Sequence, residues 1–204
     1  MTPKLHTVIA STRPGRVGPA IGRWFHEFAD SHGQFDAKLI DLADFDLPLL
    51  DEPHHPMRRE YTRDHTRIWS ESANQADAFV FVIPEYNYNP PPSFVNAIDF
   101  LYWEWQYKPV GIVSYGGVSG GLRAAQQARS QVSTLKMMPV PEGVALPNVF
   151  QQLEGGKFIA NELNTQGAAA MLNEMHKWAA ALQPLRDEVR ASLTPPAGKG
   201  EKAA

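Results

Sequence analysis

The sequence has no cysteine among its 204 residues. This absence excludes disulfides, thiolate nucleophiles, zinc–sulfur sites and iron–sulfur clusters, and it fits a reducing compartment. No apolar run approaches the roughly 20 residues that a membrane-spanning helix needs. The first residues, Met1 to His6, contain no apolar region typical of a signal peptide. We therefore expect a cytoplasmic protein without a membrane partner.

An excess of charge of one sign is also missing. The formal net charge is −3, which gives no electrostatic footprint for a nucleic-acid partner. Hydrophobic residues make up 43% and charged residues 20%, a globular composition. A chain of this length can bury a full core as one domain. We expect residues 1–193 to form that single domain, and residues 194–204, rich in Pro, Gly and Lys, to be a disordered tail.

Strand-like and helix-like segments alternate along the chain. The patterns predict strands at 5–10, 37–42, 78–83 and 109–115, with a fifth at 137–140 or 143–146, and helices at about 20–32, 59–75, 92–102, 122–135 and 164–191. Such alternation indicates an α/β fold: a parallel sheet between two layers of helices. Five strands of this kind favour the flavodoxin-like order 2-1-3-4-5. In that order the loops after the first, third and fourth strands meet at one edge of the sheet.

The loop after the third strand is the most unusual segment. A buried-type apolar run ends abruptly at Pro84, and the prolines 90–92 stiffen the exit of the loop. Backbone amides and aromatic faces there suit a flat ligand with a polar edge. The alternative is a polar loop whose tyrosines cover the sheet edge. The candidate binding residues are Pro84, Glu85, Tyr86, Asn87 and Tyr88.

The loop after the first strand is a candidate phosphate site. It carries hydroxyl and guanidinium donors ahead of a helix N-terminus, whose free N–H groups and dipole attract anions. It lacks both the glycine-lysine-serine/threonine run of a P-loop and the G-x-G-x-x-G fingerprint, which favours a mononucleotide phosphate over a dinucleotide. The alternative is an ordinary turn with solvated arginines. The candidates are Ser11, Arg13, Arg16, Val17 and Gly18.

The loop after the fourth strand has four glycines between residues 114 and 121. Glycine lets the backbone approach a ligand closely, so amides here are candidates for the polar edge of a ring. A flexible turn without a ligand is the alternative. The candidates are Ser114, Tyr115, Gly116 and Gly117.

Other candidates are weaker. His54 and His55 have no third ligand at metal spacing, so we expect solvated histidines and no metal site. The aromatic cluster Trp103, Trp105 and Tyr107 is a core edge, an active-site lining or a subunit contact, with core or interface favoured.

Three motifs resemble those of the NADPH-dependent FMN reductase family, which includes flavodoxin-like chromate, quinone and azo-dye reductases. The motifs are Ser11-Thr12-Arg13-Pro14-Gly15-Arg16, Pro84-Glu85-Tyr86-Asn87 and Ser114-Tyr115-Gly116-Gly117. The resemblance implies a flavodoxin-like fold with non-covalent FMN: phosphate on the first loop, isoalloxazine against residues 84–88, and its far edge at residues 114–117. It also implies a homodimer or homotetramer. This chain has Ala10 where the family commonly has glycine.

The leading hypothesis is an NAD(P)H-dependent FMN oxidoreductase. Hydride passes from NADPH or NADH to FMN, and the reduced flavin reduces a small-molecule acceptor by a ping-pong mechanism. The protein supplies position and electrostatics, so no catalytic side chain is required. The acceptor stays open among quinones, azo and nitro compounds, metal oxyanions and free flavin. The alternatives are a non-enzymatic electron carrier of flavodoxin type, disfavoured by the modest net charge, and a flavin-binding sensor.

Overall fold

The strands of the sheet are built from apolar runs that are buried on both faces. The computed structural model describes residues 2–193. All residues of β3 (Ala78–Pro84) and β4 (Pro109–Tyr115) are buried, and β1 (Lys4–Ile9) is exposed only at its first residue. β2 (Asp36–Asp41) and β5 (Met138–Leu146) form the two edges. All pairs are parallel and the order is β2-β1-β3-β4-β5, which confirms the predicted flavodoxin-like sheet.

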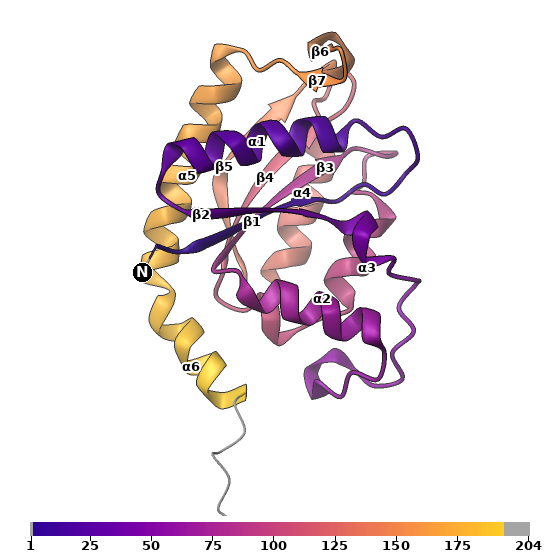
Figure 1. Ribbon diagram of the computed structural model, residues 1–204, viewed down its shortest axis with the longest axis vertical. Coiled ribbons are helices and arrows are strands. Elements are labelled where there is room, and N and C mark those ends of the chain that lie inside the picture. Colours follow the sequence, from indigo (N-terminus) through magenta and orange to yellow (C-terminus); the bar gives the residue numbers. More distant parts are fainter. Residues whose placement is uncertain (1, 194–204) are drawn as a thin grey trace, which may run out of the picture.

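Helices cover both faces of this sheet (Figure 1). α1 (Gly18–His32) and α5 (Glu162–Ala181) pack on one face, and the chain continues from α5 into α6 (Gln183–Leu193). α2 (Asp64–Gln75), α3 (Pro92–Asp99) and α4 (Leu122–Ser133) pack on the other. Two apolar clusters, one on each side of the sheet, therefore hold the three layers together.

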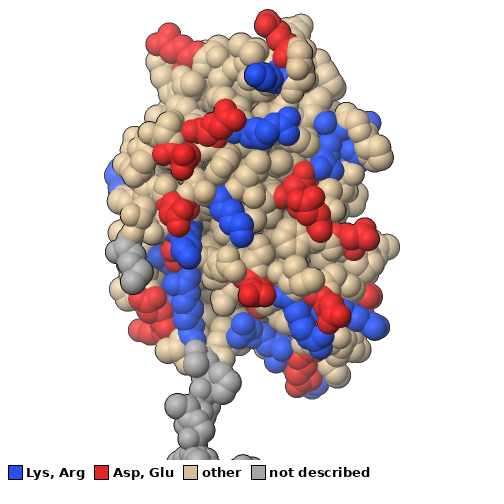
Figure 2. Space-filling model, in the orientation of Figure 1, with Lys and Arg blue, Asp and Glu red and all other residues tan. Residues whose placement is uncertain are grey.

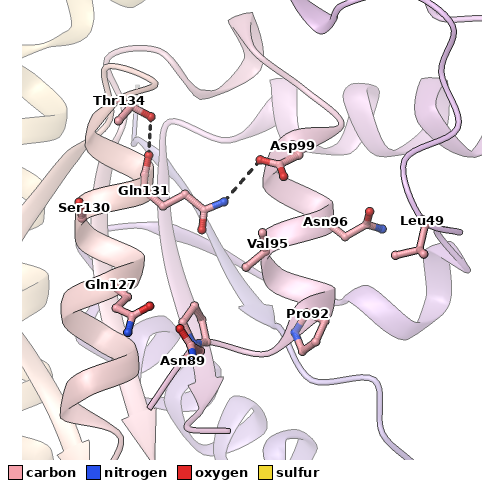
Figure 3. A pocket seen from close by; sticks show the side chains of 11 residues that line it. Leu49, Asn89, Pro92, Val95, Asn96, Asp99, Gln127, Ser130, Gln131 and Thr134 are labelled. Atoms are coloured by element: carbon pink, nitrogen blue, oxygen red, sulfur yellow. Dashed lines mark hydrogen bonds between the residues drawn. The ribbon is translucent and has the colours of Figure 1, made fainter. Parts of the chain in front are cut away.

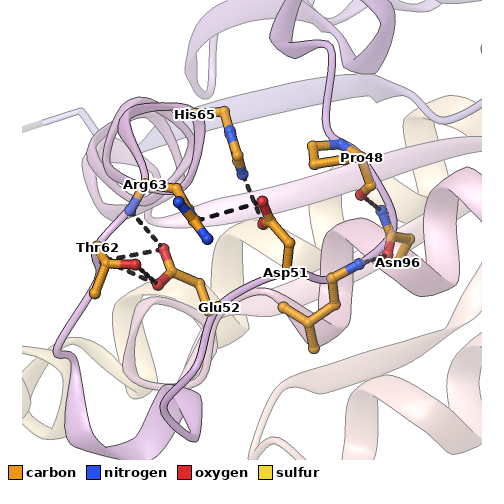
Figure 4. A network of polar contacts seen from close by, with 8 residues as sticks. Pro48, Asp51, Glu52, Thr62, Arg63, His65 and Asn96 are labelled. Carbon is orange, nitrogen blue, oxygen red and sulfur yellow. Dashed lines mark hydrogen bonds and ion pairs between the residues drawn. The ribbon is translucent and has the colours of Figure 1, made fainter.

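The long segment between β2 and α2 is held by polar contacts, and it shortens the helix predicted from residue 59. This segment contains two short 3₁₀ helices, η1 (Leu42–Phe45) and η2 (Pro56–Arg58). The carboxylate of Glu52 accepts hydrogen bonds from the N–H groups of Thr62 and Arg63 (Figure 4). Burial opposes ionisation of Glu52, yet these bonds lower its pKa to about 2. Because Glu52 takes these N–H groups, the chain stays extended at Arg63 and α2 begins at Asp64.

Three other elements differ from the sequence prediction. The final helix is two helices, because Pro184 lacks an N–H and cannot continue α5. The two alternatives for the fifth strand are parts of one strand, β5, whose register with β4 shifts at Val110 and Ile112. A small hairpin of β6 (Leu153–Glu154) and β7 (Lys157–Phe158) was not predicted, although Gly155-Gly156 is a hairpin-turn signal. The expected tail, 194–204, lies outside the described residues.

The aromatic cluster after α3 belongs mainly to the core. Trp105, in η3 (Trp103–Trp105), is fully buried and donates a hydrogen bond to the carbonyl of Ile98. Trp103 instead lies at the surface, where its indole N–H donates to the carbonyl of Met57 at 2.7 Å. The core-edge interpretation therefore holds for Trp105.

A lysine is buried at the start of β4, the end of the sheet opposite to the converging loops. The Lys108 ammonium donates to the carbonyl of Ala73 at 2.9 Å and lies 5.4 Å from the centre of the Phe79 ring. Burial lowers the pKa of Lys108 to about 7.

Charges of both signs are interspersed on the face of the molecule shown in Figure 2. This distribution agrees with the small net charge of the sequence. Between residues 2 and 193, no helix combines the length and apolar character needed to cross a membrane.

Candidate functional site

The predicted convergence of loops produces a cavity at the carboxyl ends of the strands. Because β1, β3 and β4 are neighbours in the sheet, the loops that follow them lie side by side. They enclose a cavity of about 200 Å³, and η4 (Val149–Gln152) completes its wall. The lining residues are Arg13, Arg16, Val17, Pro84, Glu85, Tyr86, Tyr115, Gly116, Gly117, Val149 and Phe150.

Most of the candidates from the sequence line this cavity, and five do not. Outside the lining are Ser11, Gly18, Asn87, Tyr88 and Ser114. The Ser114 hydroxyl donates to the carbonyl of Gly120 at 2.9 Å, so it holds the glycine loop from behind. The sequence analysis missed Val149 and Phe150, because they follow the edge strand rather than one of the three unusual loops.

The loop before α1 offers unpartnered backbone donors. Within the described residues, the N–H groups of Thr12, Arg13 and Val17 have no acceptor in the chain. No side chain caps the start of α1. Such a run of free N–H groups at a helix N-terminus binds anions. This geometry agrees with the phosphate site expected from the sequence.

Behind this loop, Ser11 and Tyr115 are packed against Gly18. The Tyr115 hydroxyl donates to Ser11 Oγ at 3.2 Å, and both side chains are buried. Burial raises the pKa of Tyr115 to about 12 although the bond to Ser11 opposes the shift, so its hydroxyl stays neutral. A Cβ on Gly18 would lie 2.5 Å from Ser11 Oγ and 2.9 Å from the Tyr115 oxygen. Only glycine fits this position without displacing them.

The two arginines of the loop differ in their environment. Arg16 is held by Asp41 at the end of β2, with 2.5 Å between Nη2 and Oδ2. Asp41 is itself fixed, because Oδ1 accepts the N–H of Ala43. The Nε of Arg16 is buried and has no hydrogen-bond partner. Arg13 is exposed and has no ion pair within residues 2–193. Arg13 is thus the uncompensated cation of the loop, whereas the charge of Arg16 is largely balanced.

The loop after β3 makes a tight two-residue turn. Tyr86 and Asn89 exchange both backbone hydrogen bonds, at 2.9 and 3.0 Å. Asn87 and Tyr88 between them have positive φ angles of 52° and 71°, as in a type I′ turn. The N–H groups of Glu85 and Tyr86 are both used within the chain. The sequence led us to expect that backbone amides of this loop bind a ligand. The N–H groups of Glu85 and Tyr86 are not free to do so.

Glu85 joins the loop after β3 to the loop after β4. Its carboxylate accepts the Ser119 hydroxyl at 2.9 Å, the Arg123 N–H at 3.1 Å and the Ala124 N–H at 3.4 Å. The Arg123 guanidinium adds an ion pair at 3.3 Å and lies 4.3 Å from the centre of the Tyr88 ring. Burial opposes ionisation of Glu85, but the hydrogen bonds from Ser119, Ala124 and Arg123 outweigh it and lower the pKa. Glu85 is therefore an ionised cap on α4.

The glycine loop allows this close arrangement. Gly121 has a φ of +79°, and a Cβ there would lie 2.7 Å from the backbone nitrogen of Tyr115. On the cavity side, the N–H of Gly117 has no acceptor within the described residues. Gly117 therefore supplies a free donor in the wall of the cavity, next to Tyr115 and Gly116.

Comparison with known proteins identifies the family. The model of the NADPH-dependent FMN reductase family matches residues 3–151. The chain belongs to this family. An NAD(P)H-dependent FMN reductase of Schizosaccharomyces pombe is 40% identical over 148 residues, which cover 72% of this chain and 74% of that protein. A quinone reductase of Escherichia coli is 29% identical over 152 residues, covering 71% and 77%.

Solved structures share the fold. The flavoenzyme NAD(P)H:(acceptor) oxidoreductase FerB from Paracoccus denitrificans superimposes with a TM-score of 0.70 at 16% identity, over 88% of this chain and 98% of that one. A WrbA-like flavodoxin from Agrobacterium tumefaciens gives a TM-score of 0.56. This member of the FMN reductase family is thus an oxidoreductase, with FMN as cofactor and NAD(P)H as hydride donor.

The tie between Glu85 and α4 gives a first testable prediction. Glu85→Gln keeps the shape of the side chain but removes its charge, and the amide NH₂ cannot accept. We expect the free energy of unfolding at pH 7 to fall by about 1–3 kcal/mol, measured by urea denaturation. Because the folded pKa of Glu85 is depressed, its contribution is present above its unfolded pKa and is lost as the pH falls through the folded value. The variant should lose less stability than the wild type on acidification.

Glu174→Gln is the matched control. Glu174 pairs with Lys177 on the surface of α5, and its removal should leave the urea midpoint nearly unchanged. Equal midpoints for Glu85→Gln and wild type would show that the carboxylate does not hold the loops together.

Proposed function

We propose that the cavity holds FMN and that the protein transfers reducing equivalents from NAD(P)H to a quinone in two half-reactions. The observation that carries the assignment is the set of unpartnered N–H groups before α1, adjacent to a slot between the next two loops. The proposed cofactor residues are Ser11, Arg13, Arg16, Val17, Gly18, Pro84, Glu85, Tyr86, Asn87, Tyr88, Ser114, Tyr115, Gly116 and Gly117.

The phosphate end of FMN fits the loop before α1. Free N–H groups of Thr12, Arg13 and Val17 match the oxygens of a phosphate, and the dipole of α1 adds to the attraction. The exposed Arg13 supplies the balancing charge. The buried, unpartnered Nε of Arg16 is a further donor, while Asp41 fixes the orientation of its guanidinium.

The ring end fits the slot between the other two loops. Pro84, Tyr86 and Gly116 offer a wall without charge, and the free N–H of Gly117 suits a ring nitrogen or carbonyl. Asn87 and Tyr88 form the exposed turn that follows Tyr86, and Ser114 holds the glycine loop through its bond to Gly120. Bound FMN supplies the two-electron redox chemistry.

The side chains in the cavity position the ligand and do not provide protons. The Glu85 carboxylate is kept ionised by its contacts with α4, and the Tyr115 hydroxyl is neutral and donates to Ser11. The overall reaction takes a hydride from NAD(P)H and a proton from solvent, so that the quinone becomes a hydroquinone and NAD(P)⁺ is released.

A quinone is the acceptor that the relatives support, because several of them carry the name quinone reductase. The same proposal includes a cytoplasmic location, which rests on the absence of cysteine from the sequence. The single domain of residues 1–193 stays a prediction.

A homodimer is part of the proposal. A groove of about 840 Å³ lies between α3 and α4, lined by Pro92 and Val95 on one side and Gln127 and Gln131 on the other (Figure 3). Leu49 at its rim is 83% exposed. The groove also includes Asn89, which closes the turn beside the cavity. A second copy seated in this groove would lie next to the cofactor site and cover the apolar rim.

The first experiment is the visible spectrum of the purified protein reconstituted with FMN, followed by anaerobic addition of NADPH. We expect a bound-flavin spectrum that bleaches within seconds. Slow bleaching with a bound flavin would favour an electron carrier or a sensor. Failure to take up FMN would remove the site assignment.

Gly18 provides a local test of the phosphate site. In Gly18→Ala the new methyl group displaces Ser11 and Tyr115, and we expect the Kd for FMN, measured by quenching of flavin fluorescence, to rise at least about tenfold, or about 1.4 kcal/mol. Gly22→Ala, one turn further along α1, is the control, because its Cβ would meet Ile9 and Leu39 of the sheet and not Ser11 or Tyr115. Equal FMN affinities for the two variants would contradict the assignment.

The dimer is tested with Leu49→Glu, which places a charge at the rim of the groove. We expect sedimentation velocity to show a dimer for the wild type and a shift toward monomer for the variant. Leu163→Glu, at an exposed position on α5, should remain dimeric. A monomeric wild type at micromolar concentration would rule the dimer out.

A further inference from the structure

Phe150 is an exposed aromatic residue in the wall of the cavity. It belongs to η4, directly after β5, and follows Val149, whose side chain is 1% exposed and packs in the core. The Phe150 side chain is 70% exposed although it lines the cavity. Val149 is thus fixed in the core, and Phe150, the next residue, is exposed to solvent at the cavity.

The backbone around Phe150 is fixed to the glycine loop. The N–H of Asn148 donates to the carbonyl of Gly117 at 2.9 Å, and the N–H of Val149 donates to that of Gly116 at 3.2 Å. On the other side, the N–H of Ile159 donates to the carbonyl of Gln152 at 2.8 Å. These bonds hold the segment at both ends. The exposure of Phe150 is therefore a consequence of the fold and not of a loose loop.

The ring of Phe150 has no aromatic partner among the described residues. An exposed phenyl ring forgoes much of the roughly 1.5–3 kcal/mol that burial would provide. The same cavity wall includes the exposed Arg13 and the half-exposed Tyr86. Arg13 is assigned to the phosphate, so the free phenyl face of Phe150 is the group in this wall that suits a second flat ring.

The deeper part of the cavity has a different character. Tyr115 and Val149 are buried there, whereas Phe150 and Arg13 in the same wall are exposed. A flat molecule that approaches this cavity from solvent can reach the exposed ring of Phe150. We propose that Phe150 determines specificity, forming one face of a slot at the cavity mouth for the planar ring of a quinone. This inference rests on the proposed function and adds the residue that selects the acceptor.

Equilibrium binding without turnover provides the test. The oxidised FMN-loaded protein is titrated with 1,4-naphthoquinone in the absence of NAD(P)H, and the change in flavin absorbance gives the Kd. We expect Phe150→Ala to raise this Kd roughly 3- to 10-fold, the amount that an aromatic pair contributes. Phe150→Leu should lie between the two, and Phe150→Trp should bind at least as tightly as the wild type.

Matched measurements separate this role from a structural one. Leu163→Ala removes an equally exposed apolar side chain from α5 and should leave the Kd unchanged. The FMN affinity of Phe150→Ala should stay within about twofold of wild type, and so should its turnover with ferricyanide, an acceptor without a flat ring.

The outcomes distinguish the inference from the proposed function. A wild-type protein that binds FMN and is reduced by NADPH, but whose naphthoquinone Kd is the same in Phe150→Ala, would overturn the role of Phe150 alone. A rise in the Kd for NADP⁺ without one for naphthoquinone would assign the slot to nicotinamide and also overturn it. Failure of the wild type to bind FMN would remove the proposed function itself.

Discussion

The carboxylate of Glu85 is the interaction on which the candidate site depends. Glu85 follows β3, and its carboxylate reaches the N-terminus of α4, where it adds to the backbone bond between Glu85 and Tyr115 in joining the two loops. An ionised carboxylate is favourable there because the helix end provides N–H donors and a positive dipole. The cavity wall is thus held by hydrogen bonds to a charged group as well as by the packing of the loops. The residue had been expected to face a ligand, and its main contacts are instead within the protein.

In the first loop, too, a charged side chain is paired within the protein. Two arginines lie before α1, but Asp41 neutralises one of them and leaves Arg13 as the free cation. A site with one uncompensated positive charge and several backbone donors matches a single phosphate group better than a chain of them. This agrees with the absence of a P-loop or dinucleotide fingerprint from the sequence, and with the FMN reductase family.

Much of this arrangement could be predicted from the sequence, for identifiable reasons. The strands β3 and β4 were predictable because they are continuous apolar runs, and the sheet order followed from their alternation with helices. The predicted start of α2 at residue 59 was wrong. The N–H groups of Thr62 and Arg63 donate to Glu52, about ten residues earlier in the chain, and are not available to a longer helix. Phe150 was missed because η4 carries no motif; it reaches the cavity only through the position of β5. The start of α2 and the position of Phe150 both depend on contacts between segments that are distant in the sequence. A local sequence pattern does not reveal such contacts.

Lys108 lies at the other end of the sheet from this site, enclosed by α2 and the aromatic residues of β3. A reagent cannot reach this amine while the core is closed, and once exposed the amine loses the burial that depresses its pKa and reacts as an ordinary lysine. Acylation of this one amine therefore has to wait for the core to open. The rate at which Lys108 is labelled therefore measures how often the sheet opens at its amino end.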